Sequence, residues 1–308
     1  MENMNNSNAV ATPQKPKFSV AISTDKYRKL INNTLGDPNR ARRFVAAISS
    51  AVAVNPALQE CEAGSILSGA LLGESLNLSP SPQLGQYYLV PFKSKAKKDR
   101  EGRIISPECT KAQFILGYKG YIQLAIRSGQ YTKINVIEVK EGELVHFDPI
   151  TEDVDLKLID DYEAREKAPT VGYCATFQYL NGFRKTIYWS KEKMLSHADK
   201  FSPAFSKESY YKIQNGQVSD RDMWNYSSFW YKNFDDMAKK TMLRQLISRW
   251  GVMSIEMITA FENDNKEIET TANGDFVSSE TEPTETPALN SQPEVTEVEE
   301  QVDLNSLD

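Results

Sequence analysis

Few residues of this chain have the types and spacing that catalysis or metal binding requires. The two histidines, His146 and His197, have no second His or Cys at the spacing of a zinc ligand set, so we expect both to be ordinary surface or core residues. The sequence contains no GxxxxGK(S/T) motif of Walker-type nucleotide sites and no GxSxG motif of serine hydrolases. The glycines of GYKGYIQ have the wrong spacing for a phosphate loop. The residues therefore predict no catalytic centre.

Two pairs of adjacent carboxylates could in principle hold magnesium. Asp235 and Asp236 fall in a predicted helix, where neighbouring side chains point about 100° apart and do not converge on one ion. Asp160 and Asp161 lie where a predicted strand passes into a loop. A metal-dependent nuclease needs several carboxylates that meet on closely spaced ions. We therefore treat a nuclease as an alternative interpretation.

The chemistry that the pattern favours is binding of a polyanion. Residues 224–250, WNYSSFWYKNFDDMAKKTMLRQLISRW, are predicted to form one long helix with an aromatic entry. Lys240 and Arg244 are four residues apart, so they share one face of this helix. Asp235 and Asp236 each precede a lysine by four residues, so the helix is either a solvated one with weak ion pairs or one that turns a face to a polyanion. Further positive charge follows nearby at Lys232, Lys239 and Arg249.

Charge is distributed unevenly along the chain. The 308 residues carry a net charge of −6, but residues 262–308 hold 14 acidic residues and one basic residue. Residues 1–261 then hold 35 basic and 28 acidic residues, a net charge of +7. A basic folded part indicates a polyanionic partner such as nucleic acid. The segment KSKAKKDREGR is a basic loop that could settle on phosphates. Its positive residues are Lys93, Lys95, Lys97, Lys98, Arg100 and Arg103.

The composition is that of an ordinary globular protein of the cell interior. No run of 18 apolar residues occurs, so we expect no membrane contact, and the polar N-terminus has no hydrophobic signal core. The three cysteines, Cys61, Cys109 and Cys174, are far apart and form no CxxC pair, so no disulfide framework is predicted. A reducing, cytoplasmic location fits this use of cysteine.

Cap and turn signals indicate an α+β fold. A helix is predicted from Thr24 to Leu35 with Gly36 at its end, and another starts at Asp37 with a proline in its first turn. The apolar helix in ECEAGSILSGALLGESLNLSP is expected to pack in the core. From Leu84 the pattern changes to strands, and Asn181–Gly182 predicts a two-residue type I′ hairpin. We predict an antiparallel sheet and hairpin core flanked by helices, with one long C-terminal helix and disordered termini.

We divide the chain into a disordered arm at 1–22, a folded core at 23–261, and an acidic disordered tail at 262–308. The tail is either a solubilising segment, a weak competitor for the basic surface, or a docking segment for a partner. Along the late helix, a stripe of apolar residues is predicted to be buried. These residues are Met237, Met242, Leu246, Trp250 and Met253.

Four blocks of sequence, in this order and at these spacings, resemble the RecT-type phage recombinases. The first is SILSGALLGESLNLSP followed by QLGQYYLVPF, and the second is AQFILGYKGYIQLAIRSGQ. The third is INVIEVKEGE, and the fourth is WNYSSFWYKNFDDMAKKTMLRQLISRWG. The similarity runs from about Ile48 to Ile258.

The resemblance implies a single-strand DNA-annealing protein that promotes homologous recombination and limited strand invasion. Such a protein makes and breaks no covalent bonds, so it is not an enzyme. The resemblance assigns DNA binding, annealing and oligomerisation to the core at 23–261. It implies no ATP and no cofactor, with magnesium acting at most through the DNA. The implied partners are single-stranded DNA and annealed duplex, further copies in a ring or filament, a phage 5′–3′ exonuclease and a host single-stranded-DNA-binding protein. The implied location is the cytoplasm of a bacterial host. A metal-dependent nuclease and a structural phage oligomer stay as alternatives.

The DNA-contacting residues of the family lie in a basic groove between a hairpin of the sheet and the late helix. Matched by motif, the resemblance points to Lys119, Tyr121, Arg127, Lys232, Lys239, Lys240 and Arg244. The loop residues Lys95, Lys97, Lys98 and Arg103 are added from charge and not from a motif. Tyr121 or Trp230 could stack on bases, although core packing is the better interpretation of Trp230.

Overall fold

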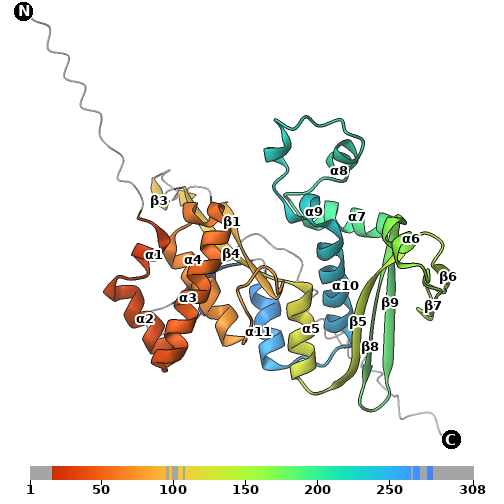
Figure 1. Ribbon diagram of the computed structural model, residues 1–308, viewed down its shortest axis with the longest axis horizontal. Coiled ribbons are helices and arrows are strands. Elements are labelled where there is room, and N and C mark those ends of the chain that lie inside the picture. The colour runs from red at the N-terminus through yellow and green to blue at the C-terminus, as the bar shows by residue number, and fades with distance from the viewer. Residues whose placement is uncertain are drawn as a thin grey trace, which may run out of the picture.

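One end of the molecule is built from helices that follow one another along the chain (Figure 1). The structure is a computed structural model that describes residues 16–94, 97–98, 103–106, 108–264, 266–270 and 276–279. The helices of this end are α1 (Phe18–Ala21), α2 (Asp25–Leu35), α3 (Pro38–Val54), the 3₁₀-helix η1 (Pro56–Glu60) and α4 (Ala63–Ser75). Gly36 ends α2 with a φ of +65°, and the Asp37 side chain caps α3 by accepting a hydrogen bond from the Asn39 N–H at 2.8 Å. Both predicted helix boundaries are confirmed.

A four-stranded antiparallel sheet lies against α4. Its strands, in spatial order, are β1 (Tyr87–Ser94), β4 (Cys109–Leu116), β10 (Lys266–Thr270) and β11 (Phe276–Ser279). Two short strands, β2 (Lys97–Lys98) and β3 (Ile104–Ser106), pair with each other between β1 and β4 in the chain. A Cβ on Gly69 of α4 would lie 2.7 Å from the Leu89 side chain. The small residues of α4 therefore allow close packing on the sheet, which confirms its predicted role in the core.

A three-stranded antiparallel sheet forms the opposite end (Figure 1). Its order is β5 (Tyr131–Lys140), β8 (Thr170–Tyr179) and β9 (Arg184–Ser190). The hairpin of β6 (Leu144–Phe147) and β7 (Val154–Leu156) covers part of its outer face, and α6 (Tyr162–Lys167) follows that hairpin. Helix α10 (Phe234–Trp250) packs on the inner face, where Ala175 and Phe177 of β8 are fully buried.

Two helices connect the sheets, and an arm projects from one side of the molecule. The connecting helices are α5 (Tyr118–Arg127) and α11 (Ile255–Asn263). These two helices lie side by side, and α5 also packs against α10. The arm comprises α8 (Lys207–Gln214) and the 3₁₀-helix η2 (Met223–Asn225). It joins α7 (Lys191–Phe201), which packs on the second sheet, to α9 (Phe229–Lys232). One apolar core runs through these parts, from Phe18 in α1 to Phe261 in α11. The predicted α+β class is confirmed.

The hairpin at Asn181–Gly182 has a different turn from the one we predicted. Strands β8 and β9 pair as expected, but only Gly182 of the two central residues has a positive φ, at +87°. The Gly182 N–H donates to the Tyr179 carbonyl at 3.0 Å, and the Tyr179 N–H donates to the Phe183 carbonyl at 2.8 Å. This is a three-residue loop with glycine in the left-handed position, the next most common hairpin class after the two-residue turn.

The long C-terminal helix predicted for 224–250 is interrupted. Helix α9 ends before Asn233, whose φ of −138° and ψ of 59° are not helical, and α10 starts at the next residue. Met242 and Leu246 of the predicted stripe are fully buried, but Trp250 is 45% exposed, so its place in the stripe was wrong. The Trp250 ring instead receives the Lys185 ammonium at 4.6 Å from its centroid on the protein surface.

Both predicted boundaries of the core move outward. Phe18 and Ile22 lie within the predicted arm, yet they are buried against the core. At the other end, α11 continues to Asn263, Asp264 is buried, and β10 pairs with β4 beyond the predicted boundary at 262. The folded part therefore extends beyond 23–261 at both ends. The sequence pattern did not reveal this, because these residues are buried by contacts with segments that are distant in the sequence.

Candidate nucleic-acid interface

Asp264, in the turn after α11, is the centre of a buried polar cluster. Its Oδ1 accepts from Lys240 Nζ at 2.8 Å and from the Leu116 N–H at 2.9 Å. Its Oδ2 accepts from Arg244 Nη1 at 2.9 Å and from the Tyr121 hydroxyl at 3.1 Å. The carboxylate is fully buried, and these four donors satisfy its two oxygens. One acidic side chain therefore connects α10, α5 and β4.

The surroundings of this cluster determine the protonation of its members. Removal from water favours the neutral amine and lowers the pKa of Lys240, while the charge of Asp264 opposes that shift. Burial and the same carboxylate raise the pKa of the Tyr121 hydroxyl, so the phenol stays protonated and can donate. The cluster is thus a paired ionic site inside the protein.

This arrangement contradicts the expectation that Lys240 and Arg244 face a polyanion. Tyr121 is 0% and Lys240 5% exposed, and the Arg244 side chain is 13% exposed. The two cations do share one helix face, as the spacing predicted, but that face turns inward to Asp264. Trp230, at 6% exposed, is a core residue. Neither Tyr121 nor Trp230 has a ring face available for stacking on a base.

Lys239 is also occupied by acidic partners. Its Nζ lies 3.2 Å from Glu138 on β5 and 3.0 Å from Asp236, and 4.8 Å from the centre of the Tyr118 ring. Burial raises the pKa of Glu138, but the hydrogen bond from Lys140 and the charge of Lys239 hold it below its ordinary value overall. The side chain of Lys239 is 15% exposed and ties α10 to β5. It therefore offers little positive charge to a ligand.

Two of the expected DNA contacts, Lys119 and Lys232, are exposed, and each lies near one member of an aromatic pair. The Tyr88 and Phe229 rings join β1 to α9 with centroids 5.8 Å apart. A Cβ built on Gly85 would lie 2.9 Å from the Tyr88 hydroxyl oxygen and 3.4 Å from Cδ of Lys119, so the Tyr88 and Lys119 side chains both approach Gly85. Lys232 is the last residue of the short helix that starts at Phe229. A hollow between the first sheet and α9–α10 is lined by Tyr88, Tyr118, Phe229, Asn233 and Met237, among others.

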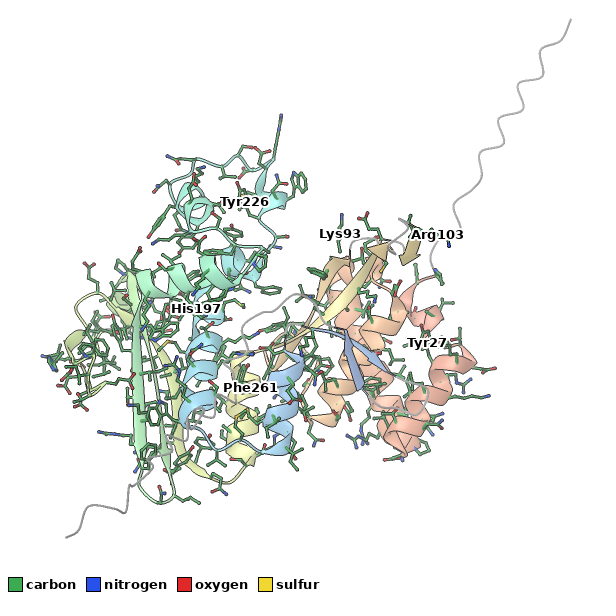
Figure 2. The ribbon with its side chains drawn as sticks, turned by 180° about the vertical axis from the view of Figure 1, so that it is seen from behind. Tyr27, Lys93, Arg103, His197, Tyr226 and Phe261 are labelled. Carbon is green, nitrogen blue, oxygen red and sulfur yellow. The ribbon has the colours of Figure 1, made fainter. Side chains whose placement is uncertain are left out.

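The basic loop begins at the rim of this region. Lys93 and Arg103 are exposed at one upper edge of the molecule, and the arm that carries Tyr226 rises at the other (Figure 2). The backbones of Lys97 and Lys98 form β2, and Lys95 lies outside the described residues. Lys93 and Arg103 therefore lie together at this edge, whereas Lys119 and Lys232 are exposed on α5 and α9.

Arg127 does not join this group. It lies in the last turn of α5, eight residues and about 12 Å along the helix from Lys119. Its guanidinium donates to the Asn77 and Gln123 carbonyls, each at 3.3 Å. Arg127 is exposed, but in this structure it closes the loop after α4.

The comparisons with known proteins give the chain its family. The sequence pattern of the RecT family matches residues 42–277. The chain belongs to the RecT family. An uncharacterized protein, YqaK, of Bacillus subtilis (strain 168) is 36% identical over 237 residues, which are 77% of this chain and 68% of that protein. Protein RecT of Escherichia coli (strain K12) is 28% identical over 227 residues, 74% of this chain and 72% of its own length. The resemblance predicted from the sequence is confirmed, and the chain is a RecT-type recombinase of the single-strand annealing class.

The RecT family match extends past the boundary that we drew at 262. It includes Asp264, β10 and the first residues of β11, and it omits α1 and α2. Asp264 is the residue of structural importance that sequence reasoning missed, because it was counted with the acidic tail. The apolar pattern of IEMITAFEN, which continues to Asn263, was the available signal that the fold does not end at Phe261.

The described part of this RecT family protein brings no three His, Cys, Asp or Glu side chains together as a metal site. Asp235 accepts from the Tyr173 hydroxyl at 2.6 Å, and Asp161 caps α6 through the Ala164 N–H. His197 packs between Trp189 and Phe201, and burial followed by the charges of Lys200 and Lys193 lowers its pKa to about 4. Among the described residues, no helix has both the length and the apolar character to span a membrane.

Proposed function

We propose that this RecT family protein binds single-stranded DNA and anneals complementary strands without ATP. Family membership carries the proposal, and the exposure of Lys119 and Lys232 near the Tyr88–Phe229 pair supports this surface as the proposed binding site. We propose that Lys119 and Lys232 contact the DNA backbone near the Tyr88–Phe229 pair. Further contacts are proposed for residues of the basic loop, namely Arg103, Lys95, Lys97 and Lys98. Arg127 is proposed as a more distant contact. Lys239, Lys240, Arg244 and Tyr121 then act by holding α10 and α5 in place.

The mechanism requires no covalent step. Two strands of DNA repel each other, and lysine and arginine contacts reduce that repulsion by neutralising phosphates and releasing counterions. Phosphate contacts carry no sequence information, so the bases remain free to test complementarity by pairing. We propose that several copies placed side by side hold a strand extended for this search. No nucleotide hydrolysis is needed, and magnesium would act on the DNA backbone.

Annealing of two oligonucleotides tests this function directly. Purified protein is mixed with a fluorescent strand and its complementary quencher strand, without ATP, with and without magnesium. The expected result is duplex formation that is faster than without protein, and no change with a non-complementary quencher strand. Duplex formation at the uncatalysed rate, while the strand is bound, would overturn annealing. Release of short labelled fragments in magnesium would favour the nuclease alternative, and no binding at low salt would favour a structural oligomer.

Strand invasion and the partners are further parts of the proposal. Pairing of a bound strand with supercoiled duplex would support limited invasion. We propose that a phage 5′–3′ exonuclease supplies the single strands and that a host single-stranded-DNA-binding protein is displaced or engaged, in a bacterial cytoplasm. The acidic tail is proposed as either a competitor for the basic face or a docking segment. Its deletion should begin after 280, because β10 and β11 lie before that point.

A further inference from the structure

An apolar patch is exposed where the β8–β9 hairpin meets the end of α10. The Tyr179 hydroxyl donates to the Trp250 carbonyl at 2.7 Å, and the Tyr131 hydroxyl donates to the Val252 carbonyl at 3.3 Å, so these segments lie side by side. The apolar side chains around these contacts are 43–81% exposed. We call them the Trp250 patch: Leu180, Phe183, Trp250, Val252 and Ile255. The hairpin turn lies at the edge of the molecule opposite α8 (Figure 1).

Positive charge accompanies the Trp250 patch. Three cations beside it are exposed, and within the described residues none of them forms an ion pair with a carboxylate. They are Lys133 on β5, Arg184 on β9 and Arg249 on α10. Glu256, in the first turn of α11, is the exposed carboxylate that follows Ile255. A ligand that fits this surface therefore carries apolar side chains together with several negative charges.

Residues 294–308 of this chain have that chemistry. They contain six acidic residues, no basic residue and five apolar ones. The apolar residues are Val295, Val298, Val302, Leu304 and Leu307. The three valines follow the spacing of one helix face. The connection from Ser279, the last residue of β11, to Glu294 can span at most about 50 Å. A segment tethered in this way meets the patch at a high effective concentration, so a small contact area suffices.

We infer that residues 294–308 dock on the Trp250 patch of their own chain. Their valines and leucines cover the patch, and their carboxylates lie beside Lys133, Arg184 and Arg249. The leucine, valine and isoleucine side chains of the patch offer no ring for stacking on a base, which disfavours single-stranded DNA as the occupant. Docking needs no DNA and goes beyond the proposed function.

The place of the patch also gives docking a consequence for the rest of the molecule. Trp250 is the last residue of α10, about 24 Å along the helix from Phe234 at its start. Lys232 lies two residues before Phe234. The docked segment therefore keeps its six carboxylates at the far end of α10 from a proposed DNA contact.

Amide hydrogen exchange of the full chain, without DNA, tests docking. Amides of residues 294–308 should exchange about tenfold or more slowly than those of a synthetic peptide with the same sequence. Two variants should remove this protection, namely Leu180→Ser with Ile255→Ser in the patch, and Arg184→Glu with Arg249→Glu beside it. Thermal unfolding of each variant shows whether its fold is intact.

Matched controls make the same changes at exposed sites elsewhere. Val145→Ser with Ile150→Ser corresponds to the apolar variant, and Arg28→Glu with Arg42→Glu corresponds to the charge variant. Both controls should keep the protection of 294–308. Exchange at the rate of the free peptide in the wild type, or equal protection in a patch variant and its control, would overturn docking.

Photo-crosslinking identifies what covers the patch. A benzoylphenylalanine in place of Ile255 should crosslink to residues 294–308, whereas one in place of Ile150 should not. Mixing chains of ordinary and heavy nitrogen isotope before irradiation separates crosslinks within one chain from crosslinks between copies. Crosslinks within one chain are expected. Crosslinks from position 255 only to another copy would overturn the inference and assign the patch to a contact between copies.

Discussion

Lys240 and Asp264 form a buried ion pair, with Nζ 2.8 Å from Oδ1, between helix α10 and the turn that follows α11. A buried charge is costly unless its partner and its hydrogen bonds are complete. Here Arg244, Tyr121 and the Leu116 N–H complete the coordination of the carboxylate. The pair therefore fixes α10 to the first sheet, so two of the cations of this helix have a structural role.

Replacing Asp264 should strongly destabilise the fold. Asp264→Ala leaves Lys240 and Arg244 buried without their carboxylate, so we expect the free energy of unfolding to fall by about 3–5 kcal/mol. Urea unfolding followed by circular dichroism measures it. Glu262→Ala, an exposed neighbour, is the control and should change stability by less than about 0.5 kcal/mol. Equal stabilities of the two variants would show that the cluster does not hold the fold together.

Lys232 and Lys240 should respond differently to substitution. Lys232→Ala should leave the unfolding midpoint unchanged and reduce the dependence of single-strand affinity on salt by roughly one phosphate contact. Lys240→Ala should instead lower stability, since it removes a buried partner of Asp264. Fluorescence anisotropy at several salt concentrations, together with thermal unfolding, separates the two effects. The same salt dependence for Lys232→Ala and the wild type would remove Lys232 from the DNA-binding face.

Gly120 is needed where α5 approaches the start of β1. A Cβ at this position would collide with the Gln86 carbonyl oxygen, which belongs to the backbone and cannot move aside freely. Gly120→Ala should therefore cost about 1–3 kcal/mol of unfolding free energy. Gly64→Ala, in α4, is the matched control because its Cβ would meet a single atom, the Tyr27 hydroxyl, at 3.3 Å. A loss no greater than that of the control would indicate that α5 has room to shift.

His197 should make stability depend on pH. Its pKa is lowered from 6.5 to about 4 in the folded protein, mainly by burial. Between these values the unfolded chain binds a proton that the folded chain does not, so stability falls as pH drops from 6.5 and this loss ends near pH 4. His197→Phe keeps the ring packing with Trp189 and removes the titration. As the pH falls from 6.5 to about 4, the free energy of unfolding of the variant should therefore rise relative to that of the wild type. A difference between the two proteins that stays constant over this pH range would show that His197 does not cause the pH dependence.

Signals carried by neighbouring residues were sufficient for much of the fold. Gly36 ends a helix, Asp37 caps the next one, and Gly182 turns a hairpin because each depends on local φ or on a hydrogen bond a few residues away. The type of that hairpin turn was not predictable to the same degree. Two-residue and three-residue loops share the Asn–Gly signal, and the register of the strands decides between them.

The sequence by itself determined the family, through four ordered blocks, and the α+β class with most of its elements. It also determined that Lys240 and Arg244 lie on one helix face, because that follows from 3.6 residues per turn. Only the tertiary structure decided which way that face turns. Asp264 is 24 residues from Lys240 and 143 from Tyr121, and no periodicity connects such distances. Burial and charge pairing depend on how distant segments pack. Only the tertiary structure therefore distinguishes the buried cations Lys240 and Arg244 from exposed ones such as Lys232.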